Sequence, residues 1–247
     1  MQPLVKGRYI ARLATDPLDV ARALSLRHLS FVTHRNLSHN LSDADTFDQH
    51  CQHILVEDTK SSTLVCCFRL MHFANRTPIT TSYSAQFYNL SRLSAHLGAK
   101  AELGRFCIHP DWSDPDILRV AWGAMTTIVD SAGVEILFGC TSFDGVDPSK
   151  YQKAFALLNM RHLAPDQFRP GQISPNVYPF ANRDPDIKCG LSEMAPLLRT
   201  YLMMGGWVSD HAVIDARLNT LHVFTGLEIA AIPPARARAL RAIAAII

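Results

Sequence analysis

The sequence feature that most restricts the fold is an almost unbroken apolar run, TLVCCFRLMHF, at residues 63–73. A run of this kind is typical of a β-strand that is buried on both faces. Further strand-like runs are expected at residues 7–14, 51–57, 100–109, 134–143, 206–214 and 220–225. The chain is therefore predicted to build a central sheet that other elements cover.

Helix signals alternate with these strands. Asp16 and Asp114 each precede a proline, which matches an N-cap followed by proline at the first helical position. Helices are expected over residues 16–32, 115–132 and 148–160, and in an amphipathic tail from residue 233. The order predicts an α/β fold with a mixed, mostly antiparallel central sheet flanked by helices.

Two long segments carry no clear period. Residues 33–50 are polar, and residues 161–190 are rich in Pro, Asn and Asp. Both are expected to be irregular. Loops of this length in compact domains are often functional, so residues 33–50 are a candidate part of a site.

Composition excludes several classes of protein. Hydrophobic residues make up 48% of the 247 residues and charged residues 19%, which supplies a core and excludes global disorder. The net charge of +2 is too small for a dedicated nucleic-acid-binding domain. The six cysteines form no C-x-x-C pair and the eleven histidines no H-x-x-x-H pair, so no metal site is expected.

Location follows from similar reasoning. The N-terminal residues lack the apolar stretch of a secretory signal, and no apolar run reaches the about 18 residues that a membrane span needs. We expect a cytoplasmic protein with reduced, mostly buried cysteines, and a peripheral contact with the inner membrane as an option.

Charged residues inside apolar elements mark a candidate site. Arg27 falls on the apolar stripe of the first helix, Arg69 interrupts the buried strand, and Glu102 and Arg105 lie in the strand-like run ELGRFCIH. A buried charge needs a partner of opposite sign, and such clusters often mark functional sites. Asp45 and Asp48, in the polar loop, are available partners. The alternative is a buried ion-pair network of Arg27 and Arg69 with Asp48 and Glu102 that only stabilises the fold.

Gly104 adds a geometric inference. In a regular strand Glu102 and Arg105 would face opposite sides, whereas a bulge at Gly104 would let both side chains serve one cleft. The same bulge would free backbone N–H groups at residues 106–108, which would polarise a thioester carbonyl.

Four motifs carry a resemblance to a known family. They are F-D-Q-H-C-Q-H at 47–53, Y-S-A-Q-F-Y at 83–88, E-L-G-R-F-C-I-H-P-D at 102–111 and L-F-G-C-T-S-F at 137–143. Over about residues 7–225 the chain resembles the ornithine N-acyltransferases that make lyso-ornithine lipid. That family is similar to the acyl-homoserine-lactone synthases, and both share a GNAT-like fold and use acyl carrier protein as donor. The resemblance implies a GNAT-like acyltransferase core at residues 1–190 and a C-terminal extension at 191–247.

The resemblance also implies roles for individual residues. The matching positions are Arg27, Phe31, Asp45, Asp48, Arg69, Glu102 and Arg105. Glu102 is the expected general base, with Arg69 and Arg105 as catalytic partners, one or the other of which binds the carboxylate of the acceptor. Asp45 and Asp48 are expected to bind a cationic amino acid, and Arg27 and Phe31 to order the loop.

Three further residues complete the predicted site. Ser142 or Thr141 is a candidate contact for a 3-hydroxyl on the acyl chain. Cys107 lies beside the site in sequence, but a nucleophilic cysteine would need a nearby histidine and an open, electropositive setting. We therefore expect Cys107 to contact substrate at most, and transfer to be direct.

One departure from the usual GNAT pattern concerns the donor. A GNAT enzyme that uses coenzyme A has a glycine-rich loop that holds the pyrophosphate at a helix N-terminus. This chain has D-W-S-D-P-D-I-L-R at 111–119, whose aspartates would repel a pyrophosphate. The expected donor is acyl-phosphopantetheine on acyl carrier protein, a substrate and not a resident cofactor. Basic residues that suit this acidic partner are Lys150, Lys153, Arg161, Arg236, Arg238 and Arg241.

The sequence leaves the acceptor open. Glutamine, glycine or lysine are alternatives to ornithine, and S-adenosylmethionine would make the chain an acyl-homoserine-lactone synthase. Against that synthase, residues 33–50 contain no tryptophan, which those enzymes usually carry there. A non-catalytic module that binds acyl chains or carrier protein is a third reading. Acyl chain length and oligomeric state are not specified.

Overall fold

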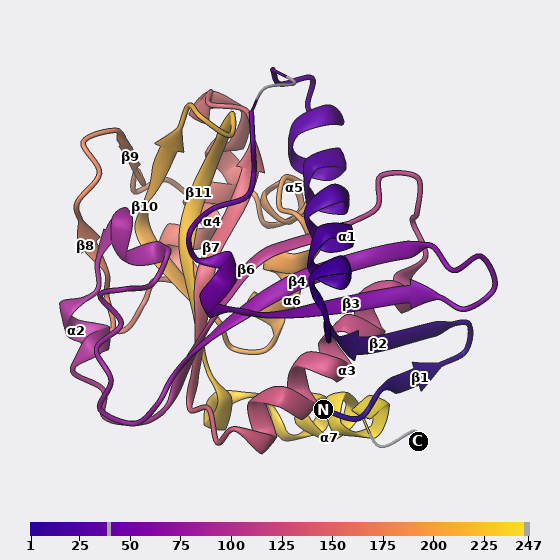
Figure 1. The fold of residues 1–247 in the computed structure, drawn as a ribbon. Coiled ribbons are helices and arrows are strands. Elements are labelled where there is room, and N and C mark those ends of the chain that lie inside the picture. The colour runs from indigo at the N-terminus through magenta and orange to yellow at the C-terminus, as the bar shows by residue number, and fades with distance from the viewer. Residues whose placement is uncertain (39–40, 245–247) are drawn as a thin grey trace. The chain divides into compact units, whose positions relative to one another are not determined.

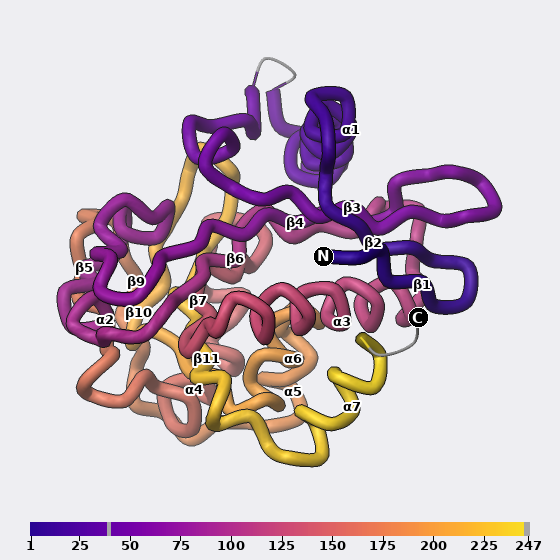
Figure 2. Tube along the Cα trace, turned by 60° about the horizontal axis from the view of Figure 1, so that its bottom comes forward, coloured from indigo at the N-terminus to yellow at the C-terminus, as the bar shows by residue number. Residues whose placement is uncertain are grey.

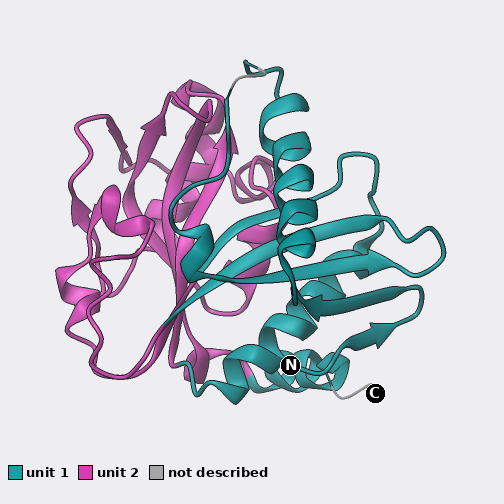
Figure 3. Cartoon of the chain, in the orientation of Figure 1, with its two compact units in different colours: residues 1–72, 103–134, 234–247 teal, residues 73–102, 135–233 magenta. Residues whose placement is uncertain are grey.

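The computed structural model describes residues 1–38 and 41–244. The chain divides into two compact units, which Figure 3 colours separately. Unit 1 contains residues 1–72, 103–134 and 234–247, and unit 2 contains residues 73–102 and 135–233. These units do not coincide with the expected core and extension, because the predicted extension contributes to both. Residues 39–40 of the expected loop and 245–247 of the expected tail helix lie outside the described residues.

Unit 1 is built on an antiparallel strand layer (Figure 1). Its strands follow the order β1 (Leu4–Lys6), β2 (Tyr9–Leu13), β3 (Gln52–Asp58) and β4 (Leu64–Phe73), each antiparallel to the next. The second part of β6 (Lys100–Ile108) belongs to this unit too.

Helices cover both faces of the unit 1 layer. Figure 2 shows α1 (Pro17–His28) on one side of β3 and β4, and α3 (Pro115–Ser131) and α7 (Pro234–Ala244) on the other. Residues 64–70 of β4 are all buried, which confirms the prediction of a strand covered on both faces.

Local capping sets where the unit 1 helices begin. Asp16 accepts a hydrogen bond from the N–H of Asp19, and Asp114 accepts one from the N–H of Asp116. Both predicted N-caps are therefore confirmed. The first helix continues past α1 as a π-helical turn at Leu29–Thr33, close to the predicted end.

Unit 2 has an antiparallel layer of its own. Its strands follow the order β7 (Ile136–Asp144), β11 (Thr220–Glu228), β10 (Trp207–Asp215) and β9 (Val177–Pro179). Its helices are α2 (Ser91–Ser94), α4 (Gln152–Arg161), α5 (Ile187–Ser192) and α6 (Pro196–Met203), and a small second sheet pairs β5 (Tyr88–Asn89) with β8 (Gly171–Gln172). Apolar residues of α4, α6, β10 and β11 form one buried cluster. Part of the predicted C-terminal extension, residues 191–247, therefore contributes to the core of unit 2.

The predicted fold class, a mostly antiparallel sheet with flanking helices, is confirmed. The expected irregular segment 161–190 does contain little regular structure, but β8 and β9 arise in it. Strand β1 and helix α6 were not predicted. Among the described residues no helix combines the length and apolar character needed to cross a membrane.

Candidate active site

Three arginines and three aspartates of unit 1 form a buried cluster, which we call the Arg–Asp network. Its aspartates come from the polar loop before β3, and its arginines come from α1, β4 and β6. The formal charges cancel, so the desolvation of each charge is offset by partners of opposite sign. The members are Arg27, Arg69, Arg105, Asp43, Asp45 and Asp48.

Arg27 is the most buried member, with 1% of its surface exposed. Its Nε donates to Asp43 Oδ2 at 2.5 Å, and its Nη2 donates to the Asp43 carbonyl oxygen at 3.0 Å. Its Nη1 and Nη2 donate to the two carboxylate oxygens of Asp48 at 2.5 and 3.2 Å. The guanidinium therefore fixes two points of the loop to α1, and its role in ordering this loop over a substrate stays a prediction.

Arg69 and Arg105 converge on the same loop. Arg69 donates to both carboxylate oxygens of Asp45, at 2.6 and 2.8 Å, and to Asp48 at 2.5 Å. Arg105 donates from Nη2 to Asp45 at 3.0 Å, and its Nε lies 2.8 Å from Asp43 Oδ1. Asp45 thus joins β4 to β6 through two arginines.

The network favours the ionised form of two of its carboxylates, Asp45 and Asp48. Burial opposes ionisation of Asp48, but hydrogen bonds from Arg27 and from a backbone N–H outweigh it and keep the pKa of Asp48 well below its usual range. The pKa of Asp45 is likewise lowered, since its pairing with Arg69 outweighs its burial. Burial lowers the pKa of Arg69, but its hydrogen bonds and ion pair with Asp45 raise that pKa by more, so the net shift is upward.

These contacts bear on the expected roles of Asp45 and Asp48. In the part of the chain that the structure describes, each carboxylate accepts four hydrogen bonds from arginines or backbone N–H groups. A substrate ammonium would have to displace such a donor, so direct binding of a cation by these two residues stays a prediction. The alternative from the sequence was a buried ion-pair network that only stabilises the fold. The ion pairs that Arg27 and Arg69 make with Asp48 are part of that alternative.

Asp43 is a member of the site that the sequence reading missed. It is 3% exposed and lies between Arg27 and Arg105. The spacing D-x-D-x-x-D at residues 43–48 was the available signal, because all three aspartates sit in one loop opposite three misplaced arginines.

The backbone distortion predicted at Gly104 lies one residue later. Arg105 has φ of +53°, in the left-handed region that a non-glycine residue rarely adopts. Gly104 has a separate reason to be glycine, because a Cβ there would lie 3.3 Å from Arg69 Nε. The strained residue is thus the one that supplies the network's third guanidinium.

Glu102 lies in unit 2, three residues before Arg105 on β6. It is 5% exposed. Its Oε2 accepts from the N–H of Tyr83 at 2.8 Å, and its Oε1 accepts from the N–H and the hydroxyl of Ser84 at 2.7 and 2.6 Å. Three donors match an ionised carboxylate, so the Y-S-A-Q-F-Y motif supplies the cradle of Glu102.

The remaining predicted residues fall in different surroundings. Phe31 and Cys107 both belong to a unit 1 cluster beneath α1. Cys107 Sγ lies 3.6 Å from Cys67 Sγ, and this contact together with burial raises the pKa of the Cys67 thiol well above its usual value. A nucleophilic cysteine needs an open, electropositive setting, whereas this thiol pair is buried. Direct transfer without a covalent bond to Cys107 stays a prediction.

Ser142 and Thr141 lie on β7 in unit 2. The Thr141 hydroxyl accepts a hydrogen bond from Thr225 on β11 at 3.0 Å and is buried, whereas Ser142 is exposed. Of the two, Ser142 is therefore the one available to a ligand, and its contact with an acyl hydroxyl stays a prediction.

Comparison with known proteins places the chain in a family. It is 32% identical, over 227 residues, to an L-ornithine N(alpha)-acyltransferase of Rhodobacter capsulatus, with 87% of this chain and 88% of the relative covered. The chain belongs to the L-ornithine N(alpha)-acyltransferase family. A second member of this acyltransferase family, from Brucella abortus, is 30% identical, with 76% of this chain and 70% of that protein covered.

The GNAT domain and the GNAT-like fold are confirmed as well. The family model of an acetyltransferase (GNAT) domain matches residues 26–123 of this acyltransferase. Among solved structures, FeeM, an N-acyl amino acid synthase from uncultured soil microbes, is similar with a TM-score of 0.52 and 11% identity, covering 100% of this chain and 99% of FeeM. At that identity the likeness concerns the fold.

The start of α3 in this acyltransferase carries a capping carboxylate. Asp114 accepts a hydrogen bond from the N–H of Asp116 at 2.9 Å and another from the Tyr9 hydroxyl at 2.8 Å. The carboxylate therefore occupies the helix N-terminus, which in a coenzyme A-dependent GNAT enzyme faces the pyrophosphate.

Proposed function

We propose that this protein transfers a 3-hydroxy fatty acyl group from acyl carrier protein to the α-amine of L-ornithine and so makes lyso-ornithine lipid. The observation that carries the proposal is the identity of 32%, over nearly the whole chain, to a relative named for acylation of the ornithine α-amine. The buried Glu102 carboxylate supplies a group able to take the proton from that amine.

The donor is inferred from the start of α3. The Asp114 carboxylate already satisfies a helix N–H there, and its charge would repel a pyrophosphate. An acyl group on the phosphopantetheine of a carrier protein brings no such pyrophosphate to the loop. We propose that acyl-phosphopantetheine is a substrate, that no further cofactor takes part, and that exposed basic residues, including Lys150, Arg236 and Arg238, contact the acidic carrier protein.

The chemistry begins with a proton transfer. The α-ammonium of the acceptor gives a proton to Glu102, directly or through a water molecule. The neutral amine then attacks the thioester carbonyl carbon, and backbone N–H groups of β6 stabilise the oxyanion. Collapse of this intermediate breaks the C–S bond, and the leaving thiolate takes up the proton that the nitrogen loses as the neutral amide forms. The hydrogen bonds from Tyr83 and Ser84 hold the Glu102 carboxylate in one position.

The Arg–Asp network has a supporting role in this proposal. Its aspartates hold the guanidiniums of Arg69 and Arg105 in place by ion pairs, and the side chains of Arg69 and Arg105 are 3% and 9% exposed. A fixed guanidinium binds a carboxylate at lower entropic cost than a mobile one, which suits recognition of the acceptor's carboxylate.

The test is mass spectrometry of a reaction that contains purified protein, 3-hydroxyacyl carrier protein and a mixture of ornithine, glutamine, glycine, lysine and S-adenosylmethionine. We expect the wild type to form N-acyl-ornithine. The amount of this product formed by Glu102→Ala should be lower by a factor of about 100 or more. An acyl-homoserine lactone would assign the chain to the other synthase activity, and absence of any product would overturn the enzymatic proposal.

A further inference from the structure

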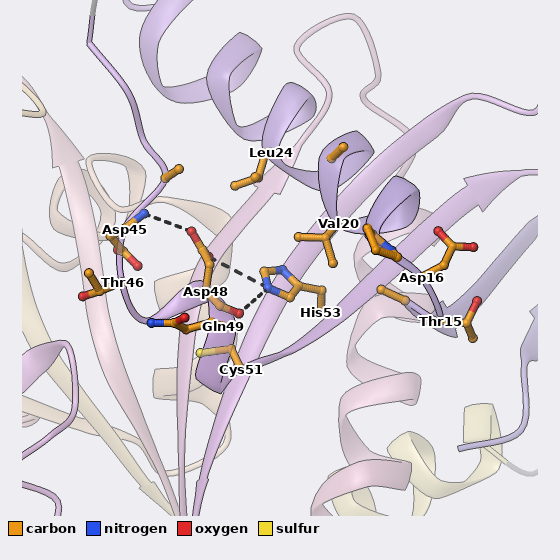
Figure 4. Close-up of a pocket in the computed structure, with 14 residues that line it drawn as sticks. Thr15, Asp16, Val20, Leu24, Asp45, Thr46, Asp48, Gln49, Cys51 and His53 are labelled. Atoms are coloured by element: carbon orange, nitrogen blue, oxygen red, sulfur yellow. Dashed lines mark hydrogen bonds and ion pairs between the residues drawn. The ribbon is translucent and has the colours of Figure 1, made fainter.

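A shallow cavity of about 1000 Å³, widely open to solvent, lies in unit 1 beside the Arg–Asp network (Figure 4). The first two turns of α1 form one wall, the loop from Ala44 to Cys51 forms another, and His53 of β3 lines it between them. A volume of this size falls within the range of small-molecule sites. Asp45 and Asp48 of the Arg–Asp network line this cavity, whereas none of the roles derived above uses Asp16 or the face of α1 that borders it.

The α1 wall is apolar. Pro17, Val20, Ala21 and Leu24 follow one another at helical spacing and face the cavity. Val20 and Leu24 are half-buried and line the cavity, so part of their apolar surface borders it. Such a wall accommodates a chain of methylene groups.

The charged residues that line the cavity are all acidic. They are Asp16, Asp45 and Asp48, and neither lysine nor arginine is among the lining residues. The guanidiniums behind Asp45 and Asp48 offset their charges. Asp16 differs, because the contact that the structure gives its carboxylate is the capping bond from Asp19, with no ion pair among the described residues. One negative charge in the lining is thus left uncompensated.

We propose that this cavity receives the side chain of the acceptor amino acid, with its terminal cation near Asp16 and its methylene stem along Val20 and Leu24. Uncharged polar groups of Thr46 and Gln49 line the opposite wall and suit the polar part of an amino acid. The inference rests on the proposed function and deepens it, since it assigns the preference for a cationic side chain to a defined place.

The decisive variant is Asp16→Asn. Asparagine caps a helix as well as aspartate does, so the change removes the charge and keeps α1 intact. Asp147 provides a matched control, because it too is an exposed N-cap aspartate and it does not line the cavity. Ala21→Lys, which places a cation in the cavity, and Ser25→Lys, on the same helix outside the lining, form a second pair.

Steady-state kinetics would use ornithine and 2-aminopentanoate, which has the same α-carbon but no side-chain ammonium. We expect Asp16→Asn to raise the KM for ornithine about tenfold with kcat little changed, as loss of one charge contact in a partly solvated site predicts. The KM for 2-aminopentanoate should stay the same, and Asp147→Asn should match the wild type with both acceptors. Ala21→Lys should raise the KM for ornithine further than Ser25→Lys does.

Calorimetric titration of ornithine into the wild type and Asp16→Asn measures binding apart from turnover. Weaker binding by the variant supports the cavity assignment. If the wild type acylates ornithine and Asp16→Asn keeps the wild-type KM and affinity, the assignment is overturned while the proposed function stands. If the wild type acylates no amino acid but binds ornithine in an Asp16-dependent manner, the proposed function fails and the cavity assignment stands as a binding site.

Discussion

Replacing Asp43 by asparagine tests whether the Arg–Asp network stabilises the fold. The side chains of Asp43 and Arg27 are 2% and 1% exposed, so the substitution leaves a net positive charge buried among three guanidiniums. Removing one partner of a buried pair costs about 3–5 kcal/mol, and asparagine keeps one acceptor, so we expect a loss of about 3 kcal/mol. For a chain of this size that corresponds to a fall in Tm of about 6–12 °C.

The assay is differential scanning calorimetry of Asp43→Asn beside the wild type. Asp130→Asn is the matched control, because it removes an aspartate from an exposed pair with Arg241 and should cause a much smaller loss. A double variant, Asp43→Asn with Arg105→Gln, restores neutrality and should recover part of the loss. Equal Tm values for Asp43→Asn and the control would refute the reasoning that this charge is buried and compensated.

Three further predictions concern acid stability, packing and the thiol pair. The pKa of Asp48 is lower in the folded than in the unfolded chain. The ionised carboxylate therefore contributes fully to the free energy of unfolding above about pH 4, and this contribution is lost as the pH falls below that value. The difference in Tm between the wild type and Asp48→Asn should therefore narrow from about pH 4 to about pH 2. Gly226→Ala should destabilise unit 2 by about 1–3 kcal/mol in urea unfolding, because a Cβ there would lie 2.2 Å from the Trp207 ring. Cys107→Ala should retain acylation within about threefold, whereas a loss of about 1000-fold would identify a covalent nucleophile.

Local chemistry explains which parts of the fold were predictable. The helix starts at Asp16 and Asp114 follow from a cap and a proline within a few residues, and the buried strand β4 follows from its own apolar run. Strand β1, Leu4–Lys6, is only three residues long, which is too short to show a strand pattern in the sequence. Its extended conformation depends on its pairing with β2.

The sequence predicted most of the residues of the candidate site, but not the ion pairs and hydrogen bonds between them. Arg27, Arg69 and Arg105 stood out because charges are rare in apolar elements, but nothing in the sequence says which aspartate each one meets. The partners of Asp43, Arg27 on α1 and Arg105 on β6, become visible only in the structure, although its spacing to Asp45 and Asp48 was a signal in the sequence. The cradle of Glu102 was also beyond reach, because Tyr83 and Ser84 donate mainly through their backbone N–H groups.

The cancellation of charge in the Arg–Asp network has an evolutionary consequence. A single substitution of one member strands an opposite charge in the interior, while a paired substitution that removes one arginine and one aspartate keeps the sum at zero. Change at these six positions should therefore pass through compensated pairs, drawn from segments as distant as α1 and β6. We expect an alignment of relatives to show the six residues either retained together or exchanged in oppositely charged pairs, with the co-varying positions tracing the contacts that join the loop to the strands.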